Sequence, residues 1–176
     1  IEMKAIVTGG AGFIGSHLTK GLLDKGCEVL VVDDLSSGYK DNIPDSAHFL
    51  DLDLSNPQLF SQLPTKNVDV VFHLASHVGQ ELSFEKPIHD FKVNGLVTLE
   101  LLNWCKENNI NKFIFASSMN VYGNSKHEYV NEKVSVAPPS PYSVGKIASE
   151  YFCRIYQELG VNCTSLRLFN VYGPNQ

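Results

Sequence analysis

The sequence predicts one α/β domain built on a doubly wound parallel sheet with helices on both faces. Short unbroken apolar runs recur at residues 5–7, 29–32, 68–72, 113–116 and 165–169. Such runs are typical of strands that are covered on both faces. Segments with helical spacing lie between them: Ile14, Leu18 and Leu22 fall on one face, opposite Lys20 and Asp24. This alternation of strands and helices implies a parallel sheet.

Two longer helices are expected in the second half of the chain. One is predicted over residues 87–108 and the other over residues 140–160. In the second, Ser140 as N-cap, Pro141 at the first helical position and Gly160 after the last turn agree with one another. Residues 51–54 are expected to end a short third strand, and residues 122–141 to form a loop.

The amino-acid composition argues against several classes of function. The 176 residues are 43% hydrophobic and 19% charged, enough for one ordinary core. A formal net charge of −5 argues against a nucleic-acid partner, because phosphate backbones are bound by clustered Lys and Arg. No apolar stretch is long enough to span a membrane. The four cysteines have no metal-site spacing, so we expect reduced thiols in a cytoplasmic protein without a metal.

A glycine-rich turn follows the first predicted strand and opens the first helix. Gly10, Gly12 and Gly15 form a G-x-G-x-x-G pattern there. Glycines at these positions let the backbone approach a pyrophosphate, whose charge is met by free N–H groups and the helix dipole. The pattern and its place predict a Rossmann-type dinucleotide site.

Asp33 indicates which dinucleotide binds. It ends the second predicted strand about 20 residues after the glycines, where a carboxylate accepts hydrogen bonds from the ribose hydroxyls. Residues 33–38 contain no Arg that could neutralise a 2′-phosphate. The sequence therefore favours NAD over NADP.

Four side chains are candidates for proton chemistry. Tyr142 and Lys146 are four residues apart on a predicted helix, so they share one face. The pKa of a phenol must fall from about 10 toward neutrality for it to act as a base, and Lys146 is expected to supply part of that change. Ser117 and Ser118 follow a predicted strand, at the edge where parallel sheets place ligand sites.

Together these residues resemble the motif series of the extended short-chain dehydrogenases/reductases, and most closely the nucleotide-sugar 4-epimerases of the UDP-glucose type. The motifs lie, in chain order, at residues 8–15, Asp33, Asp53 and Leu54, and residues 73–76, 93–95, 117–123, 142–146 and 167–174. The resemblance covers essentially the whole chain. It implies that residues 1–176 form an NAD-binding Rossmann domain, a fragment of a longer enzyme whose C-terminal substrate domain is absent.

The resemblance also implies the role of each site residue. Ser118, Tyr142 and Lys146 match the catalytic trio, and Ser118 and Asn170 are expected to contact substrate. The NAD contacts are expected from Gly9, Gly10, Gly12, Phe13, Ile14, Gly15, Asp33, Asp34, Leu35, Ser37, Gly38, Asp53, Leu54, Leu74, Ala75, Ser76, Asn94, Ser117, Tyr142 and Lys146.

The implied reaction is 4-epimerisation of a nucleotide sugar. Tyr142 takes the proton of a sugar hydroxyl, Ser118 hydrogen-bonds that oxygen, and hydride passes to tightly bound NAD to give a 4-keto intermediate. Return of the hydride to the other face of the sugar regenerates NAD. The family also implies a homodimer formed through the two long helices.

Two other functions remain open. Nucleotide-sugar 4,6-dehydratases and decarboxylases of the same family carry acidic residues just after the catalytic Ser or Thr, where this chain has Met119 and Asn120. A non-catalytic NAD-sensing module is the second alternative, and the intact Ser, Tyr and Lys set argues against it. His73, His77 and His89 are interpreted as structural histidines and not as metal ligands.

Overall fold

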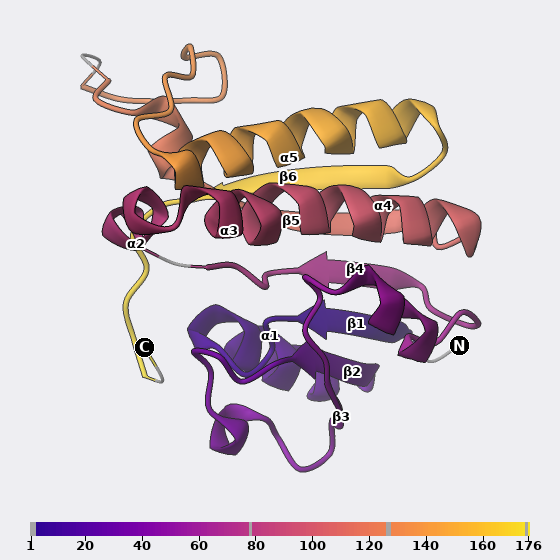
Figure 1. The fold of residues 1–176 in the computed structure, drawn as a ribbon. Helices are drawn as coiled ribbons and strands as arrows, with labels where there is room; N and C mark the ends of the chain where they lie inside the picture. Colours follow the sequence, from indigo (N-terminus) through magenta and orange to yellow (C-terminus); the bar gives the residue numbers. More distant parts are fainter. Residues whose placement is uncertain (1–2, 78, 126–127, 175) are drawn as a thin grey trace.

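The computed structural model describes residues 3–77, 79–125, 128–174 and 176 (Figure 1). Its six strands form one sheet in the order β3-β2-β1-β4-β5-β6, and all neighbouring strands run parallel. This doubly wound order confirms the predicted fold class. The strands are β1 Lys4–Thr8, β2 Glu28–Asp33, β3 His48–Asp51, β4 Val70–His73, β5 Lys112–Ser118 and β6 Asn162–Leu168.

The third strand ends earlier than expected. It stops at Asp51, so the predicted third strand is present, but of residues 51–54 only Asp51 belongs to it. The Asp53 carboxylate accepts hydrogen bonds from the backbone N–H and the hydroxyl of Ser55, which turns the chain out of the sheet. Leu52 and Leu54 are buried on either side of this turn.

The α-helices agree with the predicted segments, apart from a π-helical turn inside one segment and one helix that was not predicted. They are α1 Phe13–Leu23, α2 Gln80–Glu85, α3 Pro87–Phe91, α4 Val97–Glu107 and α5 Pro141–Glu158. A π-helical turn, Lys92–Leu96, joins α3 to α4, so the predicted helix over residues 87–108 is confirmed in extent but contains a π segment. Helix α2 was not predicted.

The caps of α5 follow the predicted pattern. Ser140 Oγ accepts a hydrogen bond from the backbone N–H of Ser143, Pro141 is the first helical residue, and Gly160 has a left-handed φ of 97°. The cap fixes where α5 begins, and this determines which side chains its first turn presents to the sheet.

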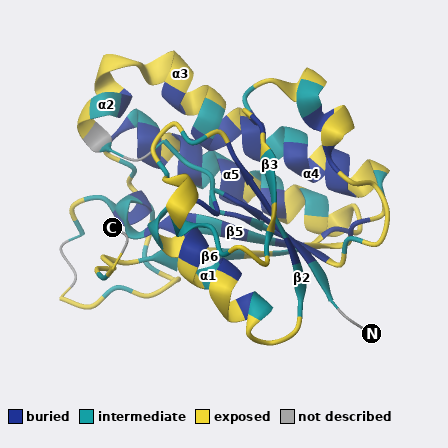
Figure 2. Ribbon diagram, turned by 90° about the horizontal axis from the view of Figure 1, so that it is seen from below, coloured by how far each residue is buried: buried dark blue, intermediate teal, exposed yellow. Residues whose placement is uncertain are grey.

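The sheet has a core on each face because successive strand residues point to opposite sides. Val7 and Val31 pack under α1 with Leu22, whereas Ile6 and Val32 belong to the core that includes α4 and α5. In Figure 2 the strands and the inward faces of the helices are mostly buried, while the outer turns of α2 and α3 are exposed.

The carboxyl ends of the strands share one edge with the N-terminal ends of α1 and α5, as parallel topology requires (Figure 1). The segment after β6 crosses this edge, and His17 Nε2 donates a hydrogen bond to Pro174 O at 2.9 Å. In the part of the chain that the structure describes, no helix is long and apolar enough to cross a membrane.

Candidate active site

The glycine-rich turn lies at the carboxyl end of β1 and leaves no room for side chains at three of its glycines, Gly9, Gly10 and Gly15. Gly9 has a φ of 71°, and a Cβ added to it would lie 2.6 Å from the backbone N of Ala75. A Cβ on Gly15 would collide with Gly9 O. At Gly12 the nearest atom to an added Cβ is Gly9 O at 3.3 Å, so this glycine is much less crowded. The turn presents bare backbone at the N-terminus of α1, and this fits a pyrophosphate.

Asp33 holds this turn in place. Its Oδ2 accepts from the backbone N–H of Ala11 at 3.0 Å, and its Oδ1 accepts from that of Leu35 at 2.9 Å. Burial raises the pKa of Asp33, and the two backbone hydrogen bonds oppose that rise. Each carboxylate oxygen has a further lone pair for a ribose hydroxyl, so the residue fits its predicted role.

The segment after Asp33 closes around the same turn. A Cβ on Gly38 would lie 2.7 Å from the backbone of Ala11, and the backbone N–H of Tyr39 donates to Ala11 O at 3.2 Å. Ile14 stays 38% exposed at the start of α1. The residues expected to contact adenosine therefore lie beside those expected at the pyrophosphate.

Two expected NAD contacts have side chains that point elsewhere. Leu54 is 6% exposed and belongs to the hydrophobic core. Ser117 donates a 2.6 Å hydrogen bond to Glu150 on α5, because alternate strand residues face opposite sides and Ser118 takes the other one. These side chains are not placed to bind a cofactor.

The predicted catalytic trio comes together at the end of β5. Tyr142, in the first turn of α5, is 9% exposed, and the Ser118 and Ser76 side chains are near enough to its phenol to lower its pKa. Lys146 Nζ lies 5.7 Å from the centre of the Tyr142 ring and donates to Ala116 O at 2.9 Å. Three residues separated in the sequence thus meet at the ligand edge of the sheet.

The electrostatics of Tyr142 differ from the expectation. Burial raises its pKa, the hydrogen bond to Ser118 opposes the rise, and the negative charge of Asp90 adds to it. Burial also lowers the pKa of Lys146 to about 8, with Asp90 opposing. The ammonium group is itself desolvated and directed at a carbonyl, so the predicted lowering of the phenol's pKa by Lys146 is not observed in this structure.

Sequence reasoning missed the polar cluster behind Tyr142. Asp90 is fully buried, and its Oδ1 accepts from Asn94 Nδ2 at 3.0 Å. Asn94 is turned inward by the π-helical segment, and its Oδ1 accepts from Ser76 Oγ at 2.8 Å. An aspartate on the buried face of a predicted helix, four residues before an asparagine, was the signal that could have revealed this cluster.

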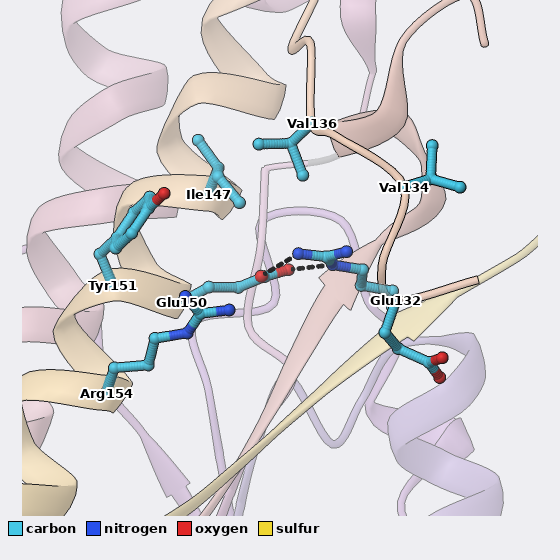
Figure 3. A pocket seen from close by; sticks show the side chains of 8 residues that line it. Glu132, Val134, Val136, Ile147, Glu150, Tyr151 and Arg154 are labelled. Atoms are coloured by element: carbon cyan, nitrogen blue, oxygen red, sulfur yellow. Dashed lines mark hydrogen bonds and ion pairs between the residues drawn. The ribbon is translucent and has the colours of Figure 1, made fainter. Parts of the chain in front are cut away.

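A second polar cluster ties α5 to the strands. Arg167 donates from Nε and Nη2 to the two carboxylate oxygens of Glu150, at 2.9 and 2.7 Å, and its guanidinium lies over the Tyr122 ring. Figure 3 shows Glu150 beside a cavity of about 140 Å³, opposite the loop that carries Val134 and Val136. Through Ser117 the same carboxylate holds the end of β5 beside the catalytic helix.

His73 and His77 have protein partners. The hydroxyls of Thr8 and Thr98 lie 2.8 and 3.2 Å from His73 Nδ1 and Nε2, and burial lowers the pKa of His73 to about 3. His73 is therefore a structural histidine, as expected. His77 Nδ1 lies 3.4 Å from Asp90 Oδ1. Within the described ranges, no group of three His, Cys, Asp or Glu side chains is placed to hold a metal.

The fold and the glycine-rich turn define a Rossmann-type dinucleotide-binding domain, with Ser118, Tyr142 and Lys146 together at its ligand edge. A family model described as the NAD dependent epimerase/dehydratase family matches residues 5–176. The chain belongs to this family, and membership confirms NAD as the expected cofactor.

Individual relatives agree with the family. A putative UDP-glucose 4-epimerase of Methanocaldococcus jannaschii is 37% identical over 97% of this chain and 57% of its own length. The structure of a Thermotoga maritima UDP-glucose 4-epimerase with UDP-glucose superposes with a TM-score of 0.94, at 35% identity, over 99% of this chain and 58% of its own. A Thermus thermophilus UDP-glucose 4-epimerase complex with NAD has a TM-score of 0.89 at 39% identity, over 99% and 57%. The chain therefore spans just over half the length of these relatives.

Proposed function

We propose that the full-length protein is an NAD-dependent nucleotide-sugar 4-epimerase of the UDP-glucose 4-epimerase type. The observation that carries the proposal is the meeting of Tyr142, Ser118 and Lys146 beside the glycine-rich cradle at one edge of the sheet. The relatives named as UDP-glucose 4-epimerases support this choice of substrate class.

The cofactor is held by backbone and by one carboxylate. The turn from Gly9 to Gly15 binds the pyrophosphate, and Asp33 accepts the ribose hydroxyls while it keeps the turn closed. NAD, when bound, supplies the hydride acceptor for the sugar carbon and a positive charge that favours the phenolate. Leu74 and Ala75, whose backbone N–H groups both donate to Thr8, form the adjacent wall.

Three side chains handle the sugar hydroxyl. The Oγ of Ser118 accepts from the backbone N–H of Asn120 at 3.2 Å, which leaves its proton for the sugar oxygen. Tyr142 accepts the proton of that hydroxyl as the carbonyl forms and returns it after the sugar has turned. Lys146 keeps a positive charge near the phenol, and Asn170, exposed after β6, is assigned to the substrate phosphates.

A decarboxylase or dehydratase is the second candidate. A UDP-glucuronic acid decarboxylase 1 of Xenopus tropicalis is 33% identical over 97% of this chain and 42% of its own length. The turn after Ser118 carries Met119 and Asn120, and neither side chain can exchange a proton at neutral pH. This composition favours epimerisation over a reaction that moves a second proton.

Tyr142→Phe in the full-length protein tests the proposal. The variant should bind NAD nearly as well as the wild type, while turnover of a nucleotide sugar falls by about 10²- to 10⁴-fold, because only the proton acceptor is lost. Tyr156→Phe is a matched control, since Tyr156 is on the same helix and its hydroxyl contacts Asn103 on α4, away from Tyr142. Turnover is followed as the change of sugar with no net formation of NADH. If Tyr142→Phe keeps most of its activity, the base lies elsewhere.

A homodimer through the long helices is part of the proposal. Helices α3, α4 and α5 and the π-helical turn lie side by side, and they expose apolar side chains at Ile88, Phe91, Leu96, Val144, Tyr151, Ile155 and Leu159. Such a surface suits a second copy of the same helices. Sedimentation of wild type and Ile155→Lys tests it: the wild type should be a dimer and the variant a monomer. A monomeric wild type would refute this part.

A further inference from the structure

The backbone carbonyl of Ala11 is held in place at the middle of the glycine-rich turn. Ala11 is fully buried, and its O accepts from the backbone N–H of Tyr39 at 3.2 Å and from Nδ2 of Asn42 at 3.0 Å. A carbonyl oxygen has two lone pairs, so both of its acceptor positions are used. The acceptor also fixes the orientation of the Asn42 amide, because only its nitrogen can donate.

Asn42 belongs to the segment that follows Asp33 and β2. It lies in a short 3-10 helix, Lys40–Asn42, and the same segment packs on Ala11 at Gly38, where an added Cβ would lie 2.7 Å from the Ala11 backbone. At the other end of the segment, Asp33 Oδ2 accepts from the N–H of Ala11 at 3.0 Å. One segment therefore holds both backbone polar groups of Ala11, the N–H through Asp33 and the carbonyl through Asn42.

The orientation of this carbonyl determines how α1 begins. In a planar trans peptide the carbonyl and the next N–H point in opposite directions, so the bond from Asn42 also directs the N–H of Gly12. That N–H donates to Gly9 O at 3.2 Å and closes the turn. Gly12 directly precedes α1 and has no side chain to cap it. The N–H groups of Phe13 and Ile14, in the first turn, have no acceptor within the helix and are available for an anion.

We propose that Asn42 is a positioning residue for the cofactor pyrophosphate. Its amide holds the Ala11 carbonyl, and with it the start of α1, in the geometry that offers backbone N–H groups to phosphate. The inference rests on the proposed pyrophosphate site and not on epimerisation, so it does not depend on the sugar substrate. It gives the segment after Asp33 a second role, because the part of the chain expected to contact adenosine also shapes the turn expected to bind the phosphates.

ADP and adenosine distinguish positioning from a merely structural role, because only ADP carries the pyrophosphate. The test uses full-length protein freed of bound cofactor. Asn42→Ala should weaken ADP binding by about 2- to 10-fold, the effect of one lost hydrogen bond, and leave adenosine binding nearly unchanged. Isothermal titration measures ADP, and an NMR titration measures adenosine. Asn42 is half-buried and outside both hydrophobic cores, so the variant should fold.

Asn108→Ala is the matched control. Nδ2 of Asn108 donates to Trp104 O at 2.8 Å at the end of α4, so this variant loses the same kind of hydrogen bond at a place remote from the turn. It should bind ADP and adenosine like the wild type. A comparable loss of ADP affinity in Asn108→Ala would show that lost stability alone weakens binding, and would overturn the inference.

The amide signals of Phe13 and Ile14 in NMR spectra give a second readout. Saturating ADP should move both signals in the wild type, because these N–H groups gain a phosphate acceptor, and should move them less in Asn42→Ala. Signals that do not move in the wild type would overturn the proposed pyrophosphate site and the inference with it. If they do move, an unchanged ADP affinity in Asn42→Ala, or an equal loss for ADP and adenosine, would overturn the inference alone.

Discussion

Replacing Lys146 by methionine should make the protein more stable while it removes a side chain of the proposed active site. Lys146 is 2% exposed, and burial lowers its pKa from the ordinary 10.5 to about 8. Below pH 8 Lys146 is therefore charged in both states, and this charge is less favourable in the folded protein than in the unfolded protein. Methionine has a similar length and carries no charge, so it fills the same space without that cost.

The expected change in the free energy of unfolding follows from the pKa shift of Lys146. A fall of about 2.5 pH units corresponds to about 3 kcal/mol of free energy of unfolding lost at neutral pH. The substitution also removes the hydrogen bond from Nζ to Ala116 O, which costs about 1 to 2 kcal/mol. The variant should therefore be about 1 to 2 kcal/mol more stable, which is a rise in Tm of about 2 to 8 °C for a chain of this size.

The pH dependence of the stability difference between variant and wild type is the more specific test. Between pH 8 and 10.5 the unfolded state binds more protons than the folded state, so wild-type stability rises with pH and the advantage of the variant shrinks. Denaturant unfolding of NAD-free protein should show the difference change sign at about pH 9 to 10. Lys106→Met, at an exposed position in the last turn of α4, should show no such trend. A variant less stable than wild type at pH 7 would refute the reasoning.

Two further predictions concern the cofactor and acid stability. NAD should bind more tightly than NADP, because Asp33 would face an uncompensated 2′-phosphate; equal affinities in a titration with both would contradict the assignment of Asp33. Burial lowers the pKa of His73 to about 3, so as the pH falls below 6.5 this residue binds a proton in the unfolded state but not in the folded state. The free energy of unfolding should therefore fall, by about 2 kcal/mol at pH 5. Unfolding at pH 7 and 5 should show this loss in the control His48→Asn and not in His73→Asn, and an equal loss in both would contradict it.

The fold could be predicted because it depends on features that are local in the sequence. Five apolar runs marked five of the strands, and Ser140, Pro141 and Gly160 marked the ends of α5. The π-helical turn could not be predicted, since the apolar spacing of residues 87–108 is that of an ordinary helix, and the contacts of this turn with α5 are not visible in the sequence.

The candidate site was predicted less completely than the fold, because the sequence of a strand does not show which face of the sheet each side chain takes. A shift of one residue exchanges the two faces of the sheet. Ser117 was therefore assigned to the cofactor although it faces Glu150, whereas Ser118 lies beside Tyr142 as expected. Asp90 was missed because its role depends on three elements meeting: α3, the π-helical turn and the end of β4.

The buried polar groups at the ligand edge explain why sequence rules fail there. Lys146 and Asp33 are both buried with their pKa values displaced by loss of solvent, and Asp90 is fully buried and near enough to raise the pKa of Tyr142. Lys146 would be replaced by an apolar residue if stability alone determined the sequence, whereas Asp33 and Asp90 also accept hydrogen bonds that hold the glycine-rich turn and Asn94 in place. A buried ammonium group at the carboxyl ends of the strands lowers the stability of the fold, and the proposed proton transfer gives a reason for it. Lys146→Met should therefore separate the two properties, stabilising the fold while it lowers turnover, whereas truncation of a core residue such as Phe113 should lower both.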